Sequence, residues 1–538
     1  MNREMPTSLS ELTLWPLLWQ PWAAIEPAAN AILRLGTVRR SLTEATPRRV
    51  RRILSRAWRM LFNLDIHEAL TLVDNIAPAL VELESGASEP LRMEMDLLRA
   101  AALALQDNSA GALSIAGLTL RQSQSQSTCL HQGATTLCRL AYWKAADFEG
   151  LHSLTRCEPS APLDKRRALV AVFDLSIDAA MEFEQLRLGT ALRLARDATT
   201  LAEKFLGPRS AVAALPASIV ARVLYEEGQF AEAENLLRDH LEAVTARGTI
   251  ETALRTYSVL ARIAARGRRE ETAYGLLSEA ENLGERRGWL RLKAAALAER
   301  VHLLLGEGRY NDAATTVARL DQVTSQASSA HCPAEASIQR CCVIAKSRLE
   351  SARGPSISAV TTLRQVHHDA VRRRDFQLAL QAALWIVEGL LSLGEHAEAR
   401  SLFDQSLEIG AALGIHETFI DCSAPVAQLL PGSYEHAGAR GNSRAALLPY
   451  IGSLLKRWQT YEASRAAPAT TTRALTSLSQ REQHVLKLIG SGLSNKQIAQ
   501  TLDIAPETVK SHAKNIFAKL DVKTRTEAAM RARHRGML

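Results

Sequence analysis

Most of the chain repeats one pattern: an Ala/Leu-rich helix, a short turn, and a second helix with apolar residues at helical spacing. The clearest turns lie at residues 226–230, 265–269, 306–310 and 392–396, and each contains a glycine. Glycine permits the positive φ that ends a helix, and a small residue in the next helix allows close packing. The pattern therefore predicts a series of helix pairs, whose second helices carry a small residue at Ala233, Ala273, Ala313 and Ala399.

Weaker turns of the same kind fit at Asp65, Asp107, Ala146, Gly189 and Gly354, so that successive turns lie about 41 residues apart. One helix pair cannot bury its apolar face alone, whereas stacked pairs build a continuous core. We therefore expect an all-α chain in which residues 57–430 form a tetratricopeptide-like (TPR-like) helical-repeat array. Such an array curves into a superhelix, and its concave groove offers a surface to a ligand or a protein partner.

The chain changes character after residue 430. Residues 431–438 contain Pro431, Gly432 and Gly438 and predict a break, followed by a last helix at about 443–463 that is interrupted near Pro449. Residues 465–474 are rich in Ala, Pro and Thr, which is typical of a linker. The expected parts are an N-terminal segment, the array, terminal helices, a linker and a C-terminal domain, at residues 1–56, 57–430, 431–464, 465–474 and 475–538.

The C-terminal part has a helical pattern of its own, which predicts four short helices at residues 480–490, 495–502, 506–520 and 525–535. Three of the four starts have the composition of a capping box, in which a hydroxyl and an acid or amide three residues later satisfy each other's backbone N–H groups. These pairs are Ser479 with Glu482, Ser494 with Gln497, and Thr524 with Glu527.

The third of these helices suggests a function. Its apolar stripe leaves an opposite face that consists of Glu507, Lys510, Ser511, Lys514 and Ala518. This narrow polar face fits a DNA major groove about 12 Å wide, where lysine can meet guanine acceptors or phosphate. A three-residue turn joins the helix to the one before it, so the outline is a helix-turn-helix.

Four motifs carry a resemblance to the LuxR-type DNA-binding domain of bacterial transcription regulators: LSQRE at 478–482, GLSNKQIA at 492–499, TVKSH at 508–512 and NIFAKL at 515–520. The resemblance implies a four-helix helix-turn-helix domain in which 506–520 is the recognition helix and 524–535 often dimerises. It implies that bases are read by Lys510, Ser511 and Lys514, and that phosphates are held by Asn495, Lys496, Thr508 and Lys519. One departure is Ala505, where the family usually has a capping serine, and that loss typically costs about 1 kcal/mol.

The array is similar in period, Ala/Leu pattern and domain order to the helical-repeat sensor of MalT-like regulators. Those regulators usually begin with an NTPase, and this chain departs from them because neither G-x-x-x-x-G-K-[ST] nor G-x-G-x-x-G occurs. We therefore expect no cofactor, and activation by a ligand, a protein partner or oligomerisation.

Charge is unevenly distributed. The formal net charge is +8, and residues 475–538 contribute 11 Lys or Arg against 5 Asp or Glu. A basic terminus on a nearly neutral body is typical of an attached DNA-binding module. A second basic stretch, residues 34–59, has nine arginines and one acid, Glu44. Two interpretations of this stretch remain open: a solvated helix face, or a strip that binds an anion or an acidic partner.

The sequence offers no support for catalysis. It contains neither G-x-S-x-G nor H-E-x-x-H, and its seven cysteines form no C-x-x-C pair. Buried free thiols are expected, with a metal or redox site at 331–332 and 341–342 as the alternative. The Trp-rich stretch 12–25 is interrupted by prolines and lacks a basic start, so neither a signal peptide nor a membrane helix is expected there or elsewhere.

Together with the LuxR-type resemblance, these patterns predict a non-enzymatic, cytoplasmic bacterial transcription regulator with no metal site. Its expected partners are double-stranded promoter DNA, a second copy of itself on DNA, RNA polymerase, and a ligand or protein at the repeat groove. The alternative is a helical-repeat interaction scaffold whose terminal domain docks a protein. A salt-dependent, site-specific gel shift on promoter DNA separates the two.

Overall fold

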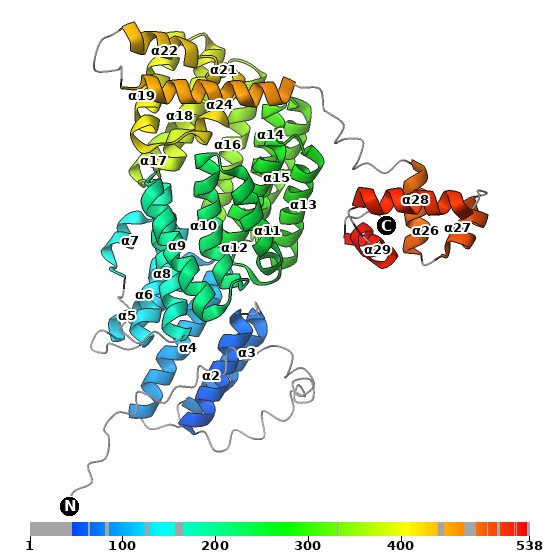
Figure 1. Ribbon diagram of the computed structural model, residues 1–538. Coiled ribbons are helices and arrows are strands. Elements are labelled where there is room, and N and C mark those ends of the chain that lie inside the picture. Colours follow the sequence, from blue (N-terminus) through cyan, green and yellow to red (C-terminus); the bar gives the residue numbers. More distant parts are fainter. Residues whose placement is uncertain are drawn as a thin grey trace, which may run out of the picture. The chain divides into compact units, whose positions relative to one another are not determined.

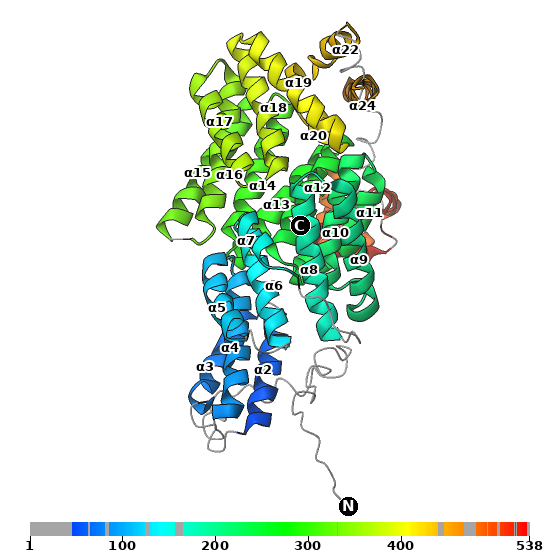
Figure 2. The ribbon, with the colours of Figure 1, turned by 90° about the vertical axis from the view of Figure 1, so that its left-hand side faces the viewer.

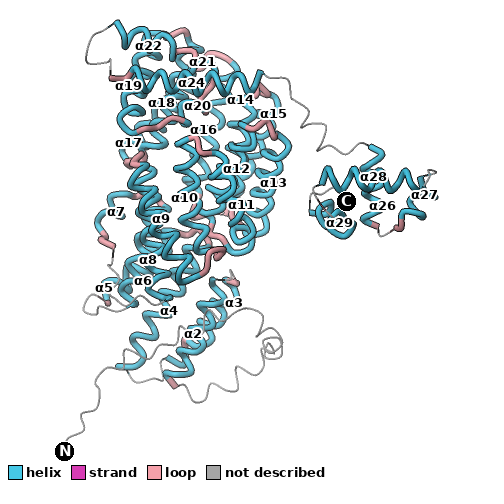
Figure 3. The backbone as a smooth tube through the Cα atoms, in the orientation of Figure 1, coloured by secondary structure: helices cyan, strands magenta, loops and turns pink. Residues whose placement is uncertain are grey.

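The computed structural model describes residues 46–62, 65–80, 85–123, 129–156, 165–330, 332–439, 446–466, 480–491, 493–502, 506–520, 522 and 524–534. Every regular element in these ranges is a helix, as Figure 3 shows. The contacts divide the chain into two units, residues 1–458 and 459–538. The predicted N-terminal Trp-rich stretch and Arg34 to Arg40 lie outside the described residues.

The first unit is an array of antiparallel helix pairs preceded by α2 (Pro47–Phe62), α3 (Ile66–Ile76) and a short 3₁₀ turn (Pro78–Leu80). The first helices of the pairs are α4 (Ser85–Leu105), α6 (Cys129–Lys144), α8 (Lys165–Glu184), α10 (Ala211–Glu227), α12 (Ile250–Arg266), α14 (Leu290–Gly306), α16 (Glu335–Arg353) and α18 (Phe376–Leu393). The second helices are α5 (Ser109–Gln122), α7 (Phe148–Ser153), α9 (Leu188–Leu206), α11 (Phe230–Arg247), α13 (Glu270–Arg287), α15 (Tyr310–Ser329), α17 (Ile357–Arg372) and α19 (His396–Leu413).

The first helices form a continuous layer. Helix α10 packs on α8 and α12, and α14 packs on α12 and α16, so that each pair is stacked on its neighbours (Figures 1 and 2). The array also winds far enough for α18 to contact α8, although some 190 residues separate these helices in the sequence. The predicted TPR-like superhelix is therefore confirmed.

The small residues predicted in the second helices lie where the pairs are tightest. Ala233, Ala273, Ala313 and Ala399 are each completely buried. A larger side chain at these positions has no space, so the alanines set the close approach of the two helices.

The turns only partly follow the glycine pattern. Gly228, Gly308 and Gly394 have a positive φ, as predicted. At residues 265–269, however, Arg268 takes the positive φ (55°) rather than Gly267. The prediction of a turn at Gly189 was wrong, because that residue lies inside α9 and the positive φ falls on Leu186 (62°). The left-handed conformation of these non-glycine residues costs about 1–2 kcal/mol each, which the surrounding packing must offset.

Residues after the array form more helix than predicted: α20 (Glu417–Ile420), α21 (Ala424–Ala427), α22 (Leu430–Ala439) and α24 (Leu448–Ala466). The predicted break at 431–438 was wrong because α22 spans it. Pro431 lies in the first turn of α22, where a missing N–H is harmless. Pro449 likewise lies in the first turn of α24 rather than interrupting it. The boundary between the two units falls within α24.

One helix of the array, α18, is long and apolar enough to span a membrane by length and composition, which the sequence prediction overlooked. Ten of its residues are buried, including Leu380, Ile386 and Val387, and the helix packs against α16, α17 and α19. The core helix of a soluble protein meets the same criteria, so α18 is weak evidence for a membrane.

Candidate nucleic-acid interface and the interior of the array

The C-terminal domain consists of α26 (Gln480–Gly490), α27 (Asn495–Leu502), α28 (Pro506–Leu520) and α29 (Arg525–His534). The prediction of these four helices is confirmed almost to the residue. Their apolar stripes meet in one core, in which α26 packs on α28 and α29, and α27 packs on α28. Each helix contributes to it: Val485, Leu486, Ile489, Ile498, Ala499, Val509, Ala513, Ile516, Ala528 and Ala532 are buried.

Two of the three predicted capping boxes are present. The Ser494 N–H donates to Gln497 Oε1 (2.8 Å), and the Gln497 N–H donates back to Ser494 Oγ (3.4 Å). Thr524 and Glu527 exchange the same two bonds, at 3.3 and 3.2 Å. Ser479 and Ala505 lie outside the described residues. The two boxes fix the starts of α27 and α29, and thereby the frame that carries α28.

Helix α28 turns a polar face away from this core. Val509, Ala513 and Ile516 are buried, whereas Thr508, Lys510, Ser511 and Lys514 are exposed. A fifth exposed residue, Asn515, lies one helical turn after Ser511 on the same side. The sequence prediction missed it, although the i,i+4 spacing was available as a signal. The side chain of Lys519 lies outside the described part of this helix.

The start of α27 adds a second small group. Lys496 is exposed, and Asn495 is half-buried because its Oδ1 accepts a hydrogen bond from Arg525 Nη1 (2.9 Å). Arg525 also donates to the carbonyl of Leu493. Arg525 therefore orients Asn495 and leaves its amide N–H groups to donate elsewhere. Because the two residues are 30 positions apart, the sequence alone gave no signal for this contact.

Comparison with known proteins supports this geometry. Residues 476–532 match the bacterial regulatory proteins of the luxR family. The C-terminal domain is a LuxR-family helix-turn-helix domain. It is 50% identical over 66 residues to the nitrate/nitrite response regulator protein NarL of Escherichia coli, a match that covers 12% of this chain and 31% of NarL.

A longer match reaches beyond the LuxR-family domain. Over 166 residues the chain is 34% identical to the HTH-type transcriptional regulator MalT of Vibrio cholerae, which covers 27% of this chain and 18% of MalT. The chain therefore spans about a third of NarL and less than a fifth of MalT. Among solved structures, the Rap protein complexed with competence and sporulation factor aligns with 78% of this chain at 14% identity and a TM-score of 0.42.

The array has a polar interior that composition did not predict. Asp421, which follows α20, accepts hydrogen bonds from Tyr225 Oη (2.9 Å), Arg262 Nη1 (3.3 Å) and Arg266 Nη2 (2.7 Å). Burial alone would raise the pKa of Asp421, but Arg266 and Arg262 outweigh burial and lower this pKa to about 2. The carboxylate is therefore charged at any physiological pH.

A neighbouring carboxylate, Glu226, is completely buried and accepts both the N–H (3.1 Å) and the hydroxyl (2.9 Å) of Thr418. Glu417 in turn faces Arg266 at 2.6 Å and Arg457 of α24, also at 2.6 Å. Helix α20 and Asp421 thus contact the C-terminal ends of α10 and α12.

These contacts reach the last helix before the LuxR-family domain. Arg457 donates to the carbonyl of Glu227 (3.3 Å) as well as to Glu417, and the hydroxyl of Tyr450 donates to the carbonyl of Ile415. The first half of α24 is therefore held against the array by its own Tyr450 and Arg457 side chains.

A second ionic cluster ties the beginning of the array to its middle. Arg291 of α14 donates to Asp107 at 2.7 and 2.8 Å, and Lys144 of α6 lies 3.0 Å from the same carboxylate. Arg291 also bonds Glu251 of α12 at 2.5 Å. Asp107 and Arg291 are 184 positions apart, so this cluster fixes the curvature of the array rather than a local turn.

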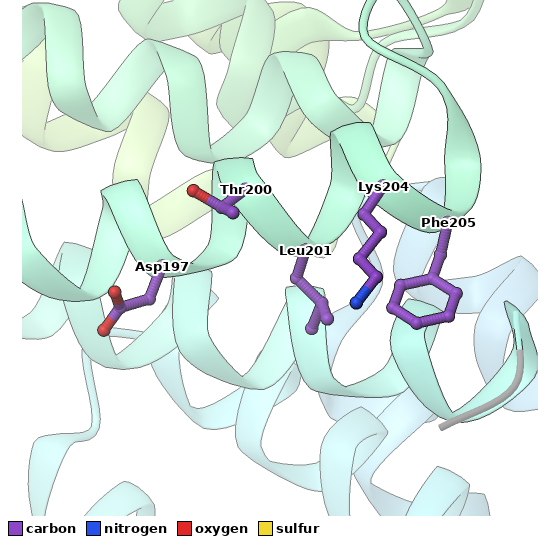
Figure 4. Close-up of a pocket in the computed structure, with 5 residues that line it drawn as sticks. All are labelled: Asp197, Thr200, Leu201, Lys204 and Phe205. Atoms are coloured by element: carbon purple, nitrogen blue, oxygen red, sulfur yellow. The ribbon is translucent and has the colours of Figure 1, made fainter. Parts of the chain in front are cut away.

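The surface hollow shown in Figure 4 does not resemble a ligand site. All of its lining residues belong to one helix, α9, and no other element contributes to it. These residues are Asp197, Thr200, Leu201, Lys204 and Phe205. Thr200 bonds its own backbone at Arg196 (3.0 Å). Among the described residues no group of three or more His, Cys, Asp or Glu is arranged to hold a metal ion. Five cysteines are free thiols: Cys138, Cys332, Cys341, Cys342 and Cys422.

Proposed function

We propose that this protein is a DNA-binding transcription regulator that reads promoter DNA with α28. The observation that carries the proposal is the exposed face of Thr508, Lys510, Ser511 and Lys514 on a helix whose other side packs in the domain core. The likeness of the same domain to NarL and MalT, both regulators, supports it.

The residues divide into two groups by position. Lys510, Ser511 and Lys514 read base edges, because they project from the middle of a helix that fits the major groove. Asn495, Lys496, Thr508 and Lys519 hold phosphates and fix the register of the domain on DNA. Asn515 extends the base-reading group, since asparagine can form two bonds to adenine.

The regulator acts in the cytoplasm of a bacterium. It binds DNA as a homodimer through the region of α29, and it contacts RNA polymerase at the promoter. Two linked LuxR-family domains gain affinity by avidity, because the second domain binds at a high local concentration once the first is bound.

Control of DNA binding lies in the array and does not require nucleotide. A ligand or protein partner that binds the array changes the contacts of α20, and Arg457 passes this change to α24. The supporting observation is that Arg457 bonds both Glu417 and the Glu227 carbonyl, which belong to opposite sides of the α10–α20 contact.

The test of DNA reading is genome-wide mapping of the bound sites, followed by gel shifts on one mapped site at several salt concentrations. We expect a specific site whose affinity falls as salt rises. Binding that does not distinguish this site from a scrambled duplex would favour a protein-interaction scaffold instead.

Array control is tested with Arg457→Gln, using Arg465→Gln as the matched control, because Arg465 is exposed on the same helix. We expect Arg457→Gln to weaken the transcriptional response to the inducing signal and the control to leave it unchanged. Deletion of residues 60–430 should abolish the response, and ATP should not change DNA affinity. A normal response in Arg457→Gln or after the deletion, or an ATP requirement, would contradict array control.

A further inference from the structure

Helix α2 carries a row of arginines that the proposed function does not use. The helix has the sequence PRRVRRILSRAWRMLF, which contains six arginines and no acidic residue. Its apolar stripe packs against α3 and α4: Val50, Leu54, Ala57, Trp58 and Leu61 are buried. Helical spacing places Arg48, Arg52 and Arg56 on the opposite side, and Arg48 and Arg52 are exposed.

Among the described residues, no carboxylate neutralises this row. Arginines in the array interior have carboxylate partners at 2.5–3.3 Å. Within the described part of the chain, Arg48, Arg52 and Arg56 form no ion pair. On α3, which packs against the other side of α2, the carboxylate of Asp74 is already bonded to Arg99 (2.9 Å). Three guanidinium groups on a helix fixed by its buried face therefore point to a partner outside the chain.

The spacing of the row fits a phosphate backbone. Residues four apart on a helix are separated by about 6 Å along its axis. Phosphates on one DNA strand are spaced by about 3.4 Å along the duplex axis, so every second phosphate lies about 7 Å further along that axis. Arginine also binds phosphate with two parallel N–H bonds, whereas lysine acts as a point charge. The row contains no lysine.

The surroundings favour DNA over other anionic partners. A helix that lies on a lipid surface buries its apolar face in the membrane, but here Leu54 and Leu61 are at most 1% exposed inside the protein. A protein interface normally has an apolar or aromatic centre, and the arginine row has none. We propose that the Arg48–Arg52–Arg56 face of α2 binds the phosphate backbone of duplex DNA flanking the site held by the LuxR-family domain.

This inference rests on the proposed function, because the LuxR-family domain brings the DNA to the chain. Once that domain is bound, flanking DNA is present at a high local concentration for α2. The contact carries no sequence information, and it raises affinity only where the duplex extends beyond the operator.

The test compares two duplexes that contain one mapped site, a short one of the operator alone and a long one extended by about two helical turns on each side. The full chain is measured against the triple variant Arg48→Gln/Arg52→Gln/Arg56→Gln. A control triple, Arg193→Gln/Arg196→Gln/Arg209→Gln, removes the same charge from an exposed part of the array near α9.

We expect the parent and the control to bind the long duplex at least tenfold more tightly than the short one. The α2 variant should lose this gain and bind the short duplex like the parent. Its slope of log affinity against log salt on the long duplex should fall by about 3, since each phosphate contact contributes about 0.9. Replacing the three arginines by lysine should restore most of the slope.

Three results would overturn the inference. The α2 variant could keep the gain on the long duplex, the control could lose it equally, or the parent could show no gain at all. Binding of the parent to phosphatidylserine vesicles that the α2 variant loses, with the long-duplex gain unchanged, would indicate a membrane surface instead. A parent that binds neither duplex would refute the proposed function as well, which distinguishes the two failures.

Discussion

The array and the LuxR-family domain use charged side chains in opposite ways. In the array, Arg262 and Arg266 are both bonded to Asp421, more than 150 positions away in the chain, and Arg262 is also bonded to Glu299. In the LuxR-family domain, Lys496 and Lys514 are exposed, and neither forms an ion pair among the described residues. A charge that is matched inside the protein fixes one geometry of the chain, whereas a charge that faces water is available to a phosphate. The two regions therefore differ in where the partners of their charged side chains lie, rather than in the number of charges.

The largest expected effect comes from removing an internal partner. Arg266→Ala removes the cation shared by Glu417 and Asp421 and leaves them only Arg457 and Arg262, and loss of one partner from a buried ion pair costs up to about 3–5 kcal/mol. The array should therefore unfold at lower urea concentration while DNA affinity of the folded protein is retained. The control is Arg364→Ala, which breaks the exposed pair with Glu398 and should cost about 0–1 kcal/mol. If both substitutions lower the stability of the array equally, the buried ion pairs of Arg266 stabilise the array no more than an exposed pair does.

Acid should weaken the same network. The folded pKa of Asp421, about 2, is below the ordinary value of about 3.9. Asp421 therefore contributes stability above pH 4, of about 2–3 kcal/mol, and this contribution is lost as the pH falls from 4 to 2. Urea unfolding across this range should show a steeper loss in the parent than in Asp421→Asn. If the stability of the parent and of Asp421→Asn falls equally between pH 4 and pH 2, Asp421 does not make this contribution.

Substitution of an exposed lysine on α28 should weaken operator binding and leave the stability of the domain unchanged. Lys514→Ala should weaken operator binding by about 1–3 kcal/mol and relax the preference at one base pair, and Lys510→Ala should behave similarly. Fluorescence anisotropy on a mapped site measures the loss, and thermal unfolding monitors the fold. The control is Lys487→Ala, which removes an exposed cation from α26. If the parent, Lys510→Ala and Lys514→Ala bind the operator equally, the recognition face has been assigned wrongly.

The smallest expected effect comes from removing a helix cap of the LuxR-family domain. Thr524→Ala removes the hydroxyl of the α29 capping box and should destabilise the LuxR-family domain by about 1 kcal/mol. Thr501→Ala is the control, since its hydroxyl bonds only the Gln497 carbonyl within α27. Array stability should not change in either variant. If Thr524→Ala shifts the unfolding of the array as well as that of the LuxR-family domain, the two units do not unfold independently.

The sequence predicted the LuxR-family domain well because its determinants are local. Apolar spacing and the caps at Ser494 and Thr524 set the helix limits, and both caps are present. The exposed positions of Lys510 and Lys514 followed from the same period. The hydrogen bond from Arg525 to Asn495 could not be predicted, because it joins helices that meet only in the tertiary structure.

For the array, the sequence predicted the stacked helix pairs but not the ion pairs in its interior. The repeat period and the buried alanines could be predicted, because both depend only on contacts within or between neighbouring helix pairs. The contact of Asp421 with Arg262 depends on the winding of the whole array, and sequence spacing contains no signal for it. The helix across Pro431 was missed for a different reason: a proline in the first turn of a helix looks the same in sequence as a proline in a break.

The most direct test of the account is operator selection by the segment Arg473–Leu538 alone. This segment has its own core, and we propose that it reads DNA without the array, which supplies control. Binding of the purified segment should be compared on a mapped operator and on a scrambled duplex of the same length and composition. We predict a segment that is helical by circular dichroism and prefers the operator, although more weakly than the full chain. An unfolded segment, or a folded one with equal affinity for both duplexes, would contradict the central claim.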